Sequence, residues 1–406
     1  MSSSATASLA RPDTLARLSA RTRVQAIDVL RGLVIVIMAL DHVRDYFHNS
    51  GYAYNPLDPN ATTPLIYATR WVTHFCAPTF VFLAGVSAWL QGAKGKAPAS
   101  LARFLLTRGL WLIVLEVTVI AFGWSFSIPL LPHLQVIWAI GVSMCALAAF
   151  VWLPTPVVLA CGIAIVAGHN MLDPIAPEQL GRFADIWRIV HDGGLIVRNG
   201  APLTIAFYPV LPWFGVMALG YGLGPIFLSA RRDRILVAMA VALLVAFVIL
   251  RGANGYGNPQ PWTVQADAVK TAMSFLDVQK YPPSLLYVCV TLGPMLLLIP
   301  LFDRMRGHVT GFFRVFGAVP LFAYVLHLYV LHALAIAAHV AVGQSIDGMF
   351  NTVHDLFLTP EVFAGTGLSI VTTYIAWVVV IAVIYFPCRW WGDVKRRRHD
   401  WWLSYL

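Results

Sequence analysis

The chain carries little charge for its length: only 12% of its 406 residues are Asp, Glu, Lys or Arg, whereas 59% are hydrophobic. An average soluble domain has about a quarter of its residues charged. Because most of a folded surface must face water, a soluble fold of this size cannot hide so much apolar surface. The composition therefore excludes a soluble enzyme, a secreted disulfide scaffold and a disordered chain. It predicts a polytopic membrane protein.

Cysteine is scarce, and the motifs of soluble enzymes are missing. The five cysteines lie in or beside apolar stretches without CxxC or metal-ligand spacing, so we interpret them as small buried hydrophobic residues. The segment 92–96 lacks the spacing of a P-loop, and the chain has neither HExxH nor GxSxG. The sequence thus predicts no metal site and no chemistry of these soluble classes.

Long apolar runs are what the sequence has instead. A membrane-spanning helix needs about 20 mostly apolar residues. Between two of the candidate spans, Leu153-Pro154-Thr155-Pro156 predicts a tight hairpin, because proline interrupts helical hydrogen bonding. We expect an all-α transmembrane helix bundle of about ten spans. The candidate stretches are 27–47, 70–92, 103–124, 134–153, 155–172, 206–228, 235–251, 284–302, 317–341 and 366–388.

The excess of basic residues, 28 Lys and Arg against 19 Asp and Glu, gives a net charge of +9. In a soluble chain this excess would suggest nucleic acid. In a membrane chain it indicates loops that stay on the cytoplasmic side. With the N-terminus inside and ten alternating spans, most basic residues fall on the inner side. We therefore expect both termini in the cytoplasm, the lipid bilayer as partner and no nucleic acid.

The chain is expected to divide into three segments. Residues 1–25 form a Ser/Ala/Arg-rich cytoplasmic tail without a signal-peptide core. Residues 26–390 form the transmembrane domain, and residues 391–406 form a basic and aromatic cytoplasmic tail. The long connections all fall on the outer side of this arrangement, which favours recognition of a substrate there. They are 48–69, 173–205, 252–283 and 342–365.

The first span carries an unusual number of ionisable residues, which are costly inside a bilayer and therefore indicate function. Arg31 and His42 are eleven residues apart, so they share one helix face about 16 Å apart along the axis. Asp45 follows His42 by one helical turn, and a neighbouring carboxylate can orient an imidazole as a base. For Arg44 we expect an interfacial position with its charge turned toward water. The full set is Asp28, Arg31, Asp41, His42, Arg44, Asp45 and His48.

Later spans add further polar groups. His74 lies near the outer end of the second span, where it could face His42. Glu116 lies in mid-span and requires a partner, for which Arg31 or Arg108 are the candidates. In the ninth span we interpret His332 and His339 as interhelical hydrogen-bonding residues, whereas His327 stays a candidate for function.

Several blocks of the sequence resemble the heparan-α-glucosaminide N-acetyltransferase family of polytopic membrane acyltransferases. The most extended blocks are Arg23–His42, with its Asp28, Arg31 and Asp41-His42, and Ala77–Gly85. Shorter blocks follow in order along the chain. They are Leu134–Ile137, Leu211–Gly215, Tyr281–Ser284 and Val319–His327.

The resemblance implies transfer of an acetyl group from cytosolic acetyl-CoA to an amino sugar on the far side of the membrane, without a metal. It implies a catalytic histidine near the outer end of the first helix, which leaves His42 and His48 open. The acceptor can also be another glycan, amine or hydroxyl compound. The resemblance further points to a bacterial relative in the inner membrane, with a homodimer as one possible state.

Acyl transfer from a thioester needs a donor site, a base and groups that stabilise an oxyanion. Arg31 or Gln135 could stabilise the oxyanion, and His42 or His74 could accept the proton. The catalytic candidates are His42, Asp41, His48 and His74. The candidates for binding acyl-CoA are Arg31, Arg108, Gln135, Lys94 and Lys96. The candidates for the acceptor are Asp45, Trp213 and His327, and the expected buried charges are Asp28 and Glu116.

A proton-coupled solute transporter is the alternative function. Its intramembrane relay would use Asp41, His42, Glu116 and His327. Against it, the first five spans hold the polar cluster and the last five show no matching set, so the sequence lacks the repeat typical of many transporters.

Overall fold

The computed structural model describes residues 12–398, 400 and 402–403. Parts of the two predicted tails, residues 1–11 and 399, 401 and 404–406, lie outside the described residues, and the predicted segment boundaries stay predictions. Helix α1 begins at Pro12 and continues without a break to Phe47.

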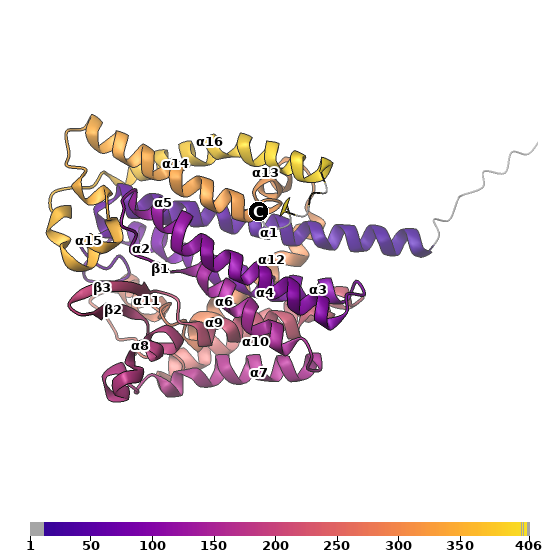
Figure 1. The fold of residues 1–406 in the computed structure, drawn as a ribbon. Coiled ribbons are helices and arrows are strands. Elements are labelled where there is room, and N and C mark those ends of the chain that lie inside the picture. The colour runs from indigo at the N-terminus through magenta and orange to yellow at the C-terminus, as the bar shows by residue number, and fades with distance from the viewer. Residues whose placement is uncertain (1–11, 399, 401, 404–406) are drawn as a thin grey trace, which may run out of the picture.

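In the described part of the chain, ten long helices form the body of the molecule and run side by side (Figure 1). Eight helical stretches among these residues are long and apolar enough to cross a membrane, and α1 and the 15-residue α6 occupy the first and fourth predicted spans. The prediction of an all-α polytopic bundle is confirmed. The ten helices are α1 (Pro12–Phe47), α3 (Cys76–Gly92), α4 (Pro98–Leu115), α6 (Val136–Phe150), α7 (Thr155–Gly168), α9 (Val210–Gly222), α10 (Arg232–Ala253), α12 (Leu285–Arg304), α14 (Pro320–Ala341) and α16 (Ile370–Arg397).

Local sequence explains where several of these helices begin and end. Pro154 lies between α6 and α7, at the predicted hairpin. The second predicted span, 70–92, is longer than expected, because α2 (Pro64–Trp71) leads into α3 through a 3₁₀ turn at Val72–Phe75. Thr63 caps α2 by accepting a hydrogen bond from the backbone N–H of Ile66.

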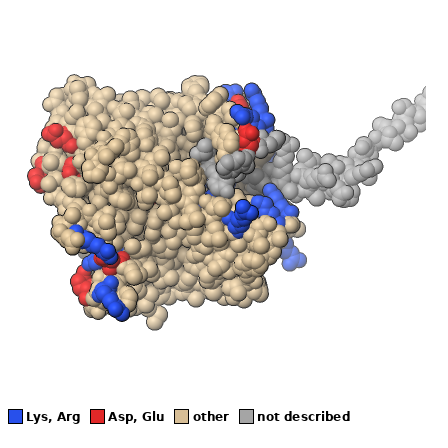
Figure 2. Space-filling model, viewed as in Figure 1, with Lys and Arg blue, Asp and Glu red and all other residues tan. Residues whose placement is uncertain are grey.

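The two ends of the bundle differ in composition. One end, which we call the loop-rich end, holds the long connections and the short elements within them (Figure 1). The opposite end, which we call the basic end, holds short connections with exposed cations such as Lys94, Arg231 and Arg304. Figure 2 shows the charged residues gathered at both ends, with an uncharged band between them on the face in view. The short helices at the loop-rich end are α5 (Ala121–Ser125), α8 (Ala184–Trp187), α11 (Ala268–Leu276) and α15 (Thr352–Leu358), whereas α13 (His308–Gly317) lies at the basic end.

A small sheet at the loop-rich end connects the 173–205 loop to the start of α6. Strand β3 (Ala201–Ala206) pairs antiparallel with β2 (Gly194–Arg198) and parallel with β1 (His133–Leu134). His133 lies opposite Ile205 in this register. The sheet therefore fixes the chain immediately before Gln135, the residue that precedes α6.

Helix α1 packs against α3, α12, α13, α14 and α16 and so lies inside the bundle (Figure 1). At Gly32 and Gly317 the backbones of α1 and α13 lie in direct contact. A Cβ atom built on Gly32 would lie 1.7 Å from the carbonyl oxygen of Phe313, and one on Gly317 would lie 1.7 Å from that of Asp28. Small residues allow this close approach, which is a recurring mode of helix packing in membranes.

Gly32→Ala is therefore expected to destabilise the bundle by about 1–3 kcal/mol, because the added methyl group forces α1 and α13 apart. The measurement is the thermal unfolding midpoint of the purified chain in detergent. Gly252→Ala in α10 is the matched control, since a Cβ there meets nothing within 4 Å. Equal midpoints for the two variants would contradict the close contact.

Candidate active site

Two cavities lie end to end beside α1. The loop-side cavity has a volume of about 180 Å³ and is lined by Asp41, His42 and Asp45 among others. The basic-side cavity has a volume of about 640 Å³ and is lined by Asp28 and Arg31 among others. Both cavities share the same three lining residues, Met38, Phe80 and Val136. The cavities therefore meet at these three side chains.

His42 lies near this junction and is held by aromatic neighbours. Its ring stacks on the ring of His327 with centroids 5.0 Å apart, and it meets Trp124 edge-on at 4.9 Å. Tyr324 packs edge-on at 6.1 Å. Trp124 lines the loop-side cavity and Tyr324 lines the basic-side cavity, so His42 contacts the walls of both.

The hydrogen bonds of the two histidines assign their tautomers. Nδ1 of His327 lies 3.1 Å from the carbonyl oxygen of Ala323, which can only accept, so this nitrogen carries the proton. Nε2 of His327 then has a free lone pair and accepts from Nδ1–H of His42 at 2.8 Å. Nε2 of His42 is thereby left unprotonated, which is the state of a general base.

The carboxylates near His42 in the chain form ion pairs with arginines. Arg44 is buried, and its Nη2 donates to Asp41 at 3.0 Å and to Asp45 at 2.6 Å. Arg70 binds the other oxygen of Asp41 at 3.3 Å. The predicted interfacial position of Arg44 is wrong, and the ring partner of His42 is His327 instead of Asp45. A buried guanidinium is strongly destabilising without a paired carboxylate, so the arginines take both acids.

Two other histidine candidates lie away from the cavities. His48 caps the turn at Asn49–Gly51, where its Nδ1 accepts the backbone N–H of Ser50 at 3.0 Å. His74 is fully buried between Trp71 and Tyr287, and neither of its ring nitrogens has a hydrogen-bond partner among the described residues. Neither histidine belongs to the lining of the loop-side cavity, so the structure brings neither of them to the open side of His42.

Trp213, an acceptor candidate, is also fully buried, between Tyr208 and Tyr287. It lines neither of the two cavities, whereas its neighbour Tyr208 lines the loop-side cavity. Trp213 therefore supports that cavity wall from behind.

Among the residues that the structure describes, four cations and one acid, Asp28, line the basic-side cavity. Arg31 pairs with Asp28 at 3.4 Å and donates to Ser87 at 2.5 Å. Lys96 donates to Gln91 at 2.8 Å. Of the predicted acyl-CoA residues, Lys94 is exposed and lies outside both cavities, and Gln135 lines the loop-side cavity instead. The four cations are Arg31, Lys96, Arg108 and Lys395.

Glu116 has a different partner from the predicted one. Its Oε2 accepts the backbone N–H of Trp138 at 2.9 Å, in the first turn of α6. The first N–H groups of a helix have no partner within the helix and carry partial positive charge, so they stabilise a carboxylate. The prediction of a pair with Arg31 or Arg108 is therefore wrong. Glu116 joins α4 to α6 beside the junction of the cavities.

The prediction that His332 and His339 form hydrogen bonds between helices is confirmed for His332 and wrong for His339. His332 bridges the carbonyl oxygens of Gly123 at 2.9 Å and Met349 at 2.7 Å. His339 bonds within its own helix, to the carbonyl oxygen of Ala335 at 2.8 Å. Both are structural in this arrangement.

Sequence reasoning missed several residues of the site. Lys280, assigned to an outer loop, is 8% exposed and lines the loop-side cavity. Lys395, assigned to the C-terminal tail, lines the basic-side cavity. The side chains of Trp124 and Tyr324 adjoin each other. Neither the indole Nε1 of Trp124 nor the hydroxyl Oη of Tyr324 makes a well-formed hydrogen bond within the described part of the chain. These residues carry no local signal, because only the packing of distant helices brings them together.

His133, in β1 of the small sheet, is buried. Burial lowers its pKa to about 4, so the imidazole is neutral at physiological pH. It therefore adds no charge beside Gln135.

Comparison with known proteins agrees with this arrangement. The family described as heparan-alpha-glucosaminide N-acetyltransferase, catalytic, matches residues 23–254, which is more than half of the chain. No curated protein matches this chain. The matched region runs from α1 to the end of α10 and includes Arg31, His42 and Trp124, whereas His327 and Lys395 lie beyond it. The chain belongs to the heparan-α-glucosaminide N-acetyltransferase family of membrane acetyltransferases.

Proposed function

We propose that this protein transfers an acetyl group from acetyl-CoA, bound in the basic-side cavity, to an amine or hydroxyl acceptor bound in the loop-side cavity. The observation that carries the proposal is the meeting of the two cavities at Met38, Phe80 and Val136, with cations on one side and His42 on the other. Family membership supports acetyl transfer as the reaction class.

The basic-side cavity suits the donor. Coenzyme A carries several phosphates, and Arg31, Lys96, Arg108 and Lys395 offer charge-assisted hydrogen bonds to them. The basic end would face the cytoplasm by the positive-inside rule, which is where acetyl-CoA is made available. The pantetheine arm would then extend along α1 from Arg31 toward His42, about 16 Å by helix geometry.

The loop-side cavity suits the acceptor. Asp45 has 32% of its side chain exposed and could hold an ammonium or hydroxyl group of an amino sugar. Nε2 of His42 would remove the proton from the attacking nitrogen or oxygen, as His327 holds the ring from the opposite side.

The proposed chemical step is direct attack on the thioester. The acceptor atom forms a bond to the carbonyl carbon, its proton goes to His42, and the carbonyl oxygen becomes an oxyanion. Collapse breaks the C–S bond, and the leaving CoA thiolate takes the proton back from His42. Trp124 Nε1–H and Tyr324 Oη–H, which lie beside His42 and make no well-formed hydrogen bond among the described residues, would stabilise the oxyanion. Arg31 would lie about three helical turns from this step, so we propose it for donor binding alone.

The test uses the full chain in proteoliposomes, with radiolabelled acetyl-CoA outside and glucosamine inside, or the reverse. The expected result is acetylglucosamine formed at the expense of acetyl-CoA in one orientation, with one free CoA thiol per product. A proton flux that needs no CoA, together with no acetylated product from glucosamine, other amines or glycans, would favour the transporter instead.

A further inference from the structure

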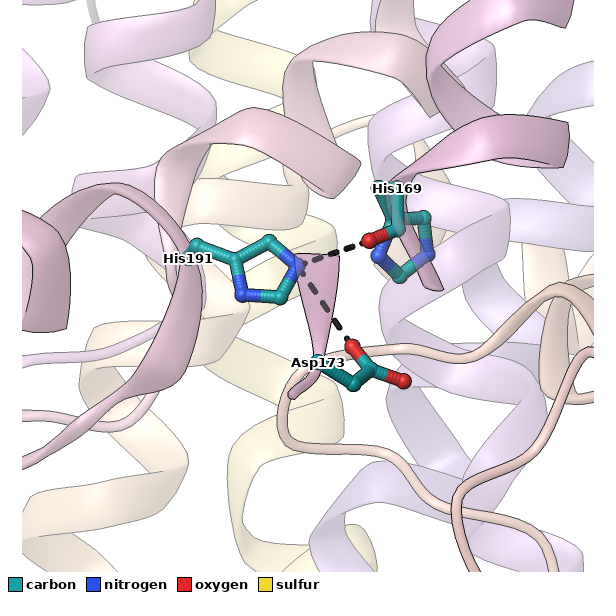
Figure 3. Close-up of side chains that lie close together, drawn as sticks. All are labelled: His169, Asp173 and His191. Carbon is teal, nitrogen blue, oxygen red and sulfur yellow. Dashed lines mark hydrogen bonds and ion pairs between the residues drawn. The ribbon is translucent and has the colours of Figure 1, made fainter. Parts of the chain in front are cut away.

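A second group of chemically active side chains lies at the loop-rich end, outside the lining of either cavity. His169 follows α7, Asp173 lies four residues later, and His191 lies in a π-helical turn at Arg188–Asp192 (Figure 3). One ligand atom from each residue lies within 4.8 Å of the other two. Two of the three are almost fully buried: His169 is 2% exposed and His191 is 1% exposed.

The hydrogen bonding of the group is incomplete. Neither ring nitrogen of His169 makes a well-formed hydrogen bond, although the backbone of Pro283 lies near the ring, and neither does Oδ1 of Asp173, within the part of the chain that the structure describes. Oδ1 of Asp173 lies 3.5 Å from Nε2 of His191. Buried polar atoms are nearly always satisfied in folded proteins, so three open lone-pair or donor positions in one place indicate a missing ligand.

Neighbouring residues hold the three side chains in place. Asn170 donates to Oδ2 of Asp173 at 2.8 Å, which leaves Oδ1 open, and its own oxygen accepts the backbone N–H of Leu285 at 2.9 Å. Trp187 stacks on His191 with ring centroids 5.0 Å apart. Supporting contacts of this kind orient the ligands in metal sites.

We propose that His169, Asp173 and His191 bind a divalent metal ion of the zinc class. Two imidazole nitrogens and one carboxylate oxygen form a typical zinc ligand set, whereas calcium and magnesium prefer oxygen ligands alone. The carbonyl oxygen of His169, 3.0 Å from Nε2 of His191, or a water molecule completes the coordination. On binding, Nε2 of His191 gives up its hydrogen bond to that carbonyl, and the single proton of the neutral ring moves from Nε2 to Nδ1. The sequence did not predict this site, because His191 is far from the other two residues in the chain.

The metal would fasten one wall of the loop-side cavity. His191 directly precedes β2, and β2 pairs with β3 in the sheet that adjoins α6. The chain after β3 supplies Phe207 and Tyr208 to the cavity lining. A metal at His191 therefore ties that wall to the end of α7.

The test titrates Zn²⁺ into the full chain, purified in detergent and freed of metal with a chelator, by calorimetry. One zinc ion per chain is expected, with Mg²⁺ giving no binding. His169→Ala, Asp173→Asn and His191→Gln are each expected to weaken zinc binding at least tenfold. His354→Ala is the matched control, since His354 pairs with Asp355 at 2.9 Å in α15, where the described residues offer no third ligand, and it is expected to bind zinc as the parent does.

Thermal unfolding separates the metal from the fold. Zinc is expected to raise the unfolding midpoint of the parent and of His354→Ala but not that of the three ligand variants, because a ligand that binds only the folded state stabilises it. His191→Gln keeps a donor for the carbonyl oxygen of His169 and is expected to fold without metal. Absence of stoichiometric zinc binding by the parent, or binding that all three ligand variants retain, would overturn the proposal.

Discussion

His42→Ala is expected to lower the rate of acetyl transfer by at least about 100-fold, because a positioned general base contributes roughly that much or more. The loss should fall on kcat, with little change in the KM for acetyl-CoA, since the basic-side cavity stays intact. The measurement is the initial rate of product formation from labelled acetyl-CoA at saturating acceptor. His48→Ala, outside the cavity, is the control for loss of a nearby histidine.

The partner of His42 supplies a second control. His327→Gln places an amide oxygen where it can accept from Nδ1–H of His42, whereas His327→Leu cannot. The glutamine variant should therefore retain more activity than the leucine variant, and the pH at which activity falls should shift between them. Full activity of His42→Ala, with the chain folded and acetyl-CoA bound, would show that the base is another residue.

Removal of positive charge from the basic-side cavity is expected to raise the KM for acetyl-CoA. Asp28, predicted to be buried, is only half-buried. Arg31→Gln, combined with Asp28→Asn so that this acid is not left unpaired, should raise the KM about 10-fold or more, because a hydrogen bond to a charged group contributes about 1.5–3 kcal/mol. kcat should change little, since Arg31 lies about three helical turns from His42. The measurement is the dependence of the initial rate on acetyl-CoA concentration.

Lys94 and Lys96 provide a matched pair within one loop. Both lysines are exposed, but Lys96 lines the basic-side cavity and Lys94 lines neither cavity. Lys96→Gln should raise the KM for acetyl-CoA severalfold, and Lys94→Gln should leave it unchanged. Equal effects of the two substitutions would mean that general surface charge, and not the cavity, attracts the donor.

The fold was predictable because hydrophobic length is a local property. Each of the ten apolar stretches corresponds to a helix, and the proline-rich segment at Leu153-Pro154-Thr155-Pro156 lies between α6 and α7 as expected. The concentration of ionisable residues in the first span could also be recognised from that segment alone. His42 and Arg31 were placed on one face of a helix, and the structure puts them in adjoining cavities.

Partner choice was much less predictable. Arg44 was expected to turn its charge toward water at the membrane interface, yet it binds Asp41 and Asp45. Glu116 was expected to pair with an arginine, yet it accepts a backbone N–H in the first turn of α6. In both cases burial decided the outcome, because a charge removed from water takes whichever opposite charge or free backbone donor packing places beside it. Which group that is depends on helix rotation and depth, and residue spacing does not record them.

The sequence by itself determined that this chain crosses a membrane many times and that its first helix carries the polar residues of a site. The length of an apolar run and the presence of ionisable residues within it are both properties of one continuous segment. Only the tertiary structure decided that His327, 285 residues away, holds His42, that Lys395 joins the basic-side cavity, and that His191 meets His169 and Asp173. Each of these depends on contacts between helices or loops distant in the chain. Such contacts follow from how whole surfaces pack, which no single stretch of sequence specifies.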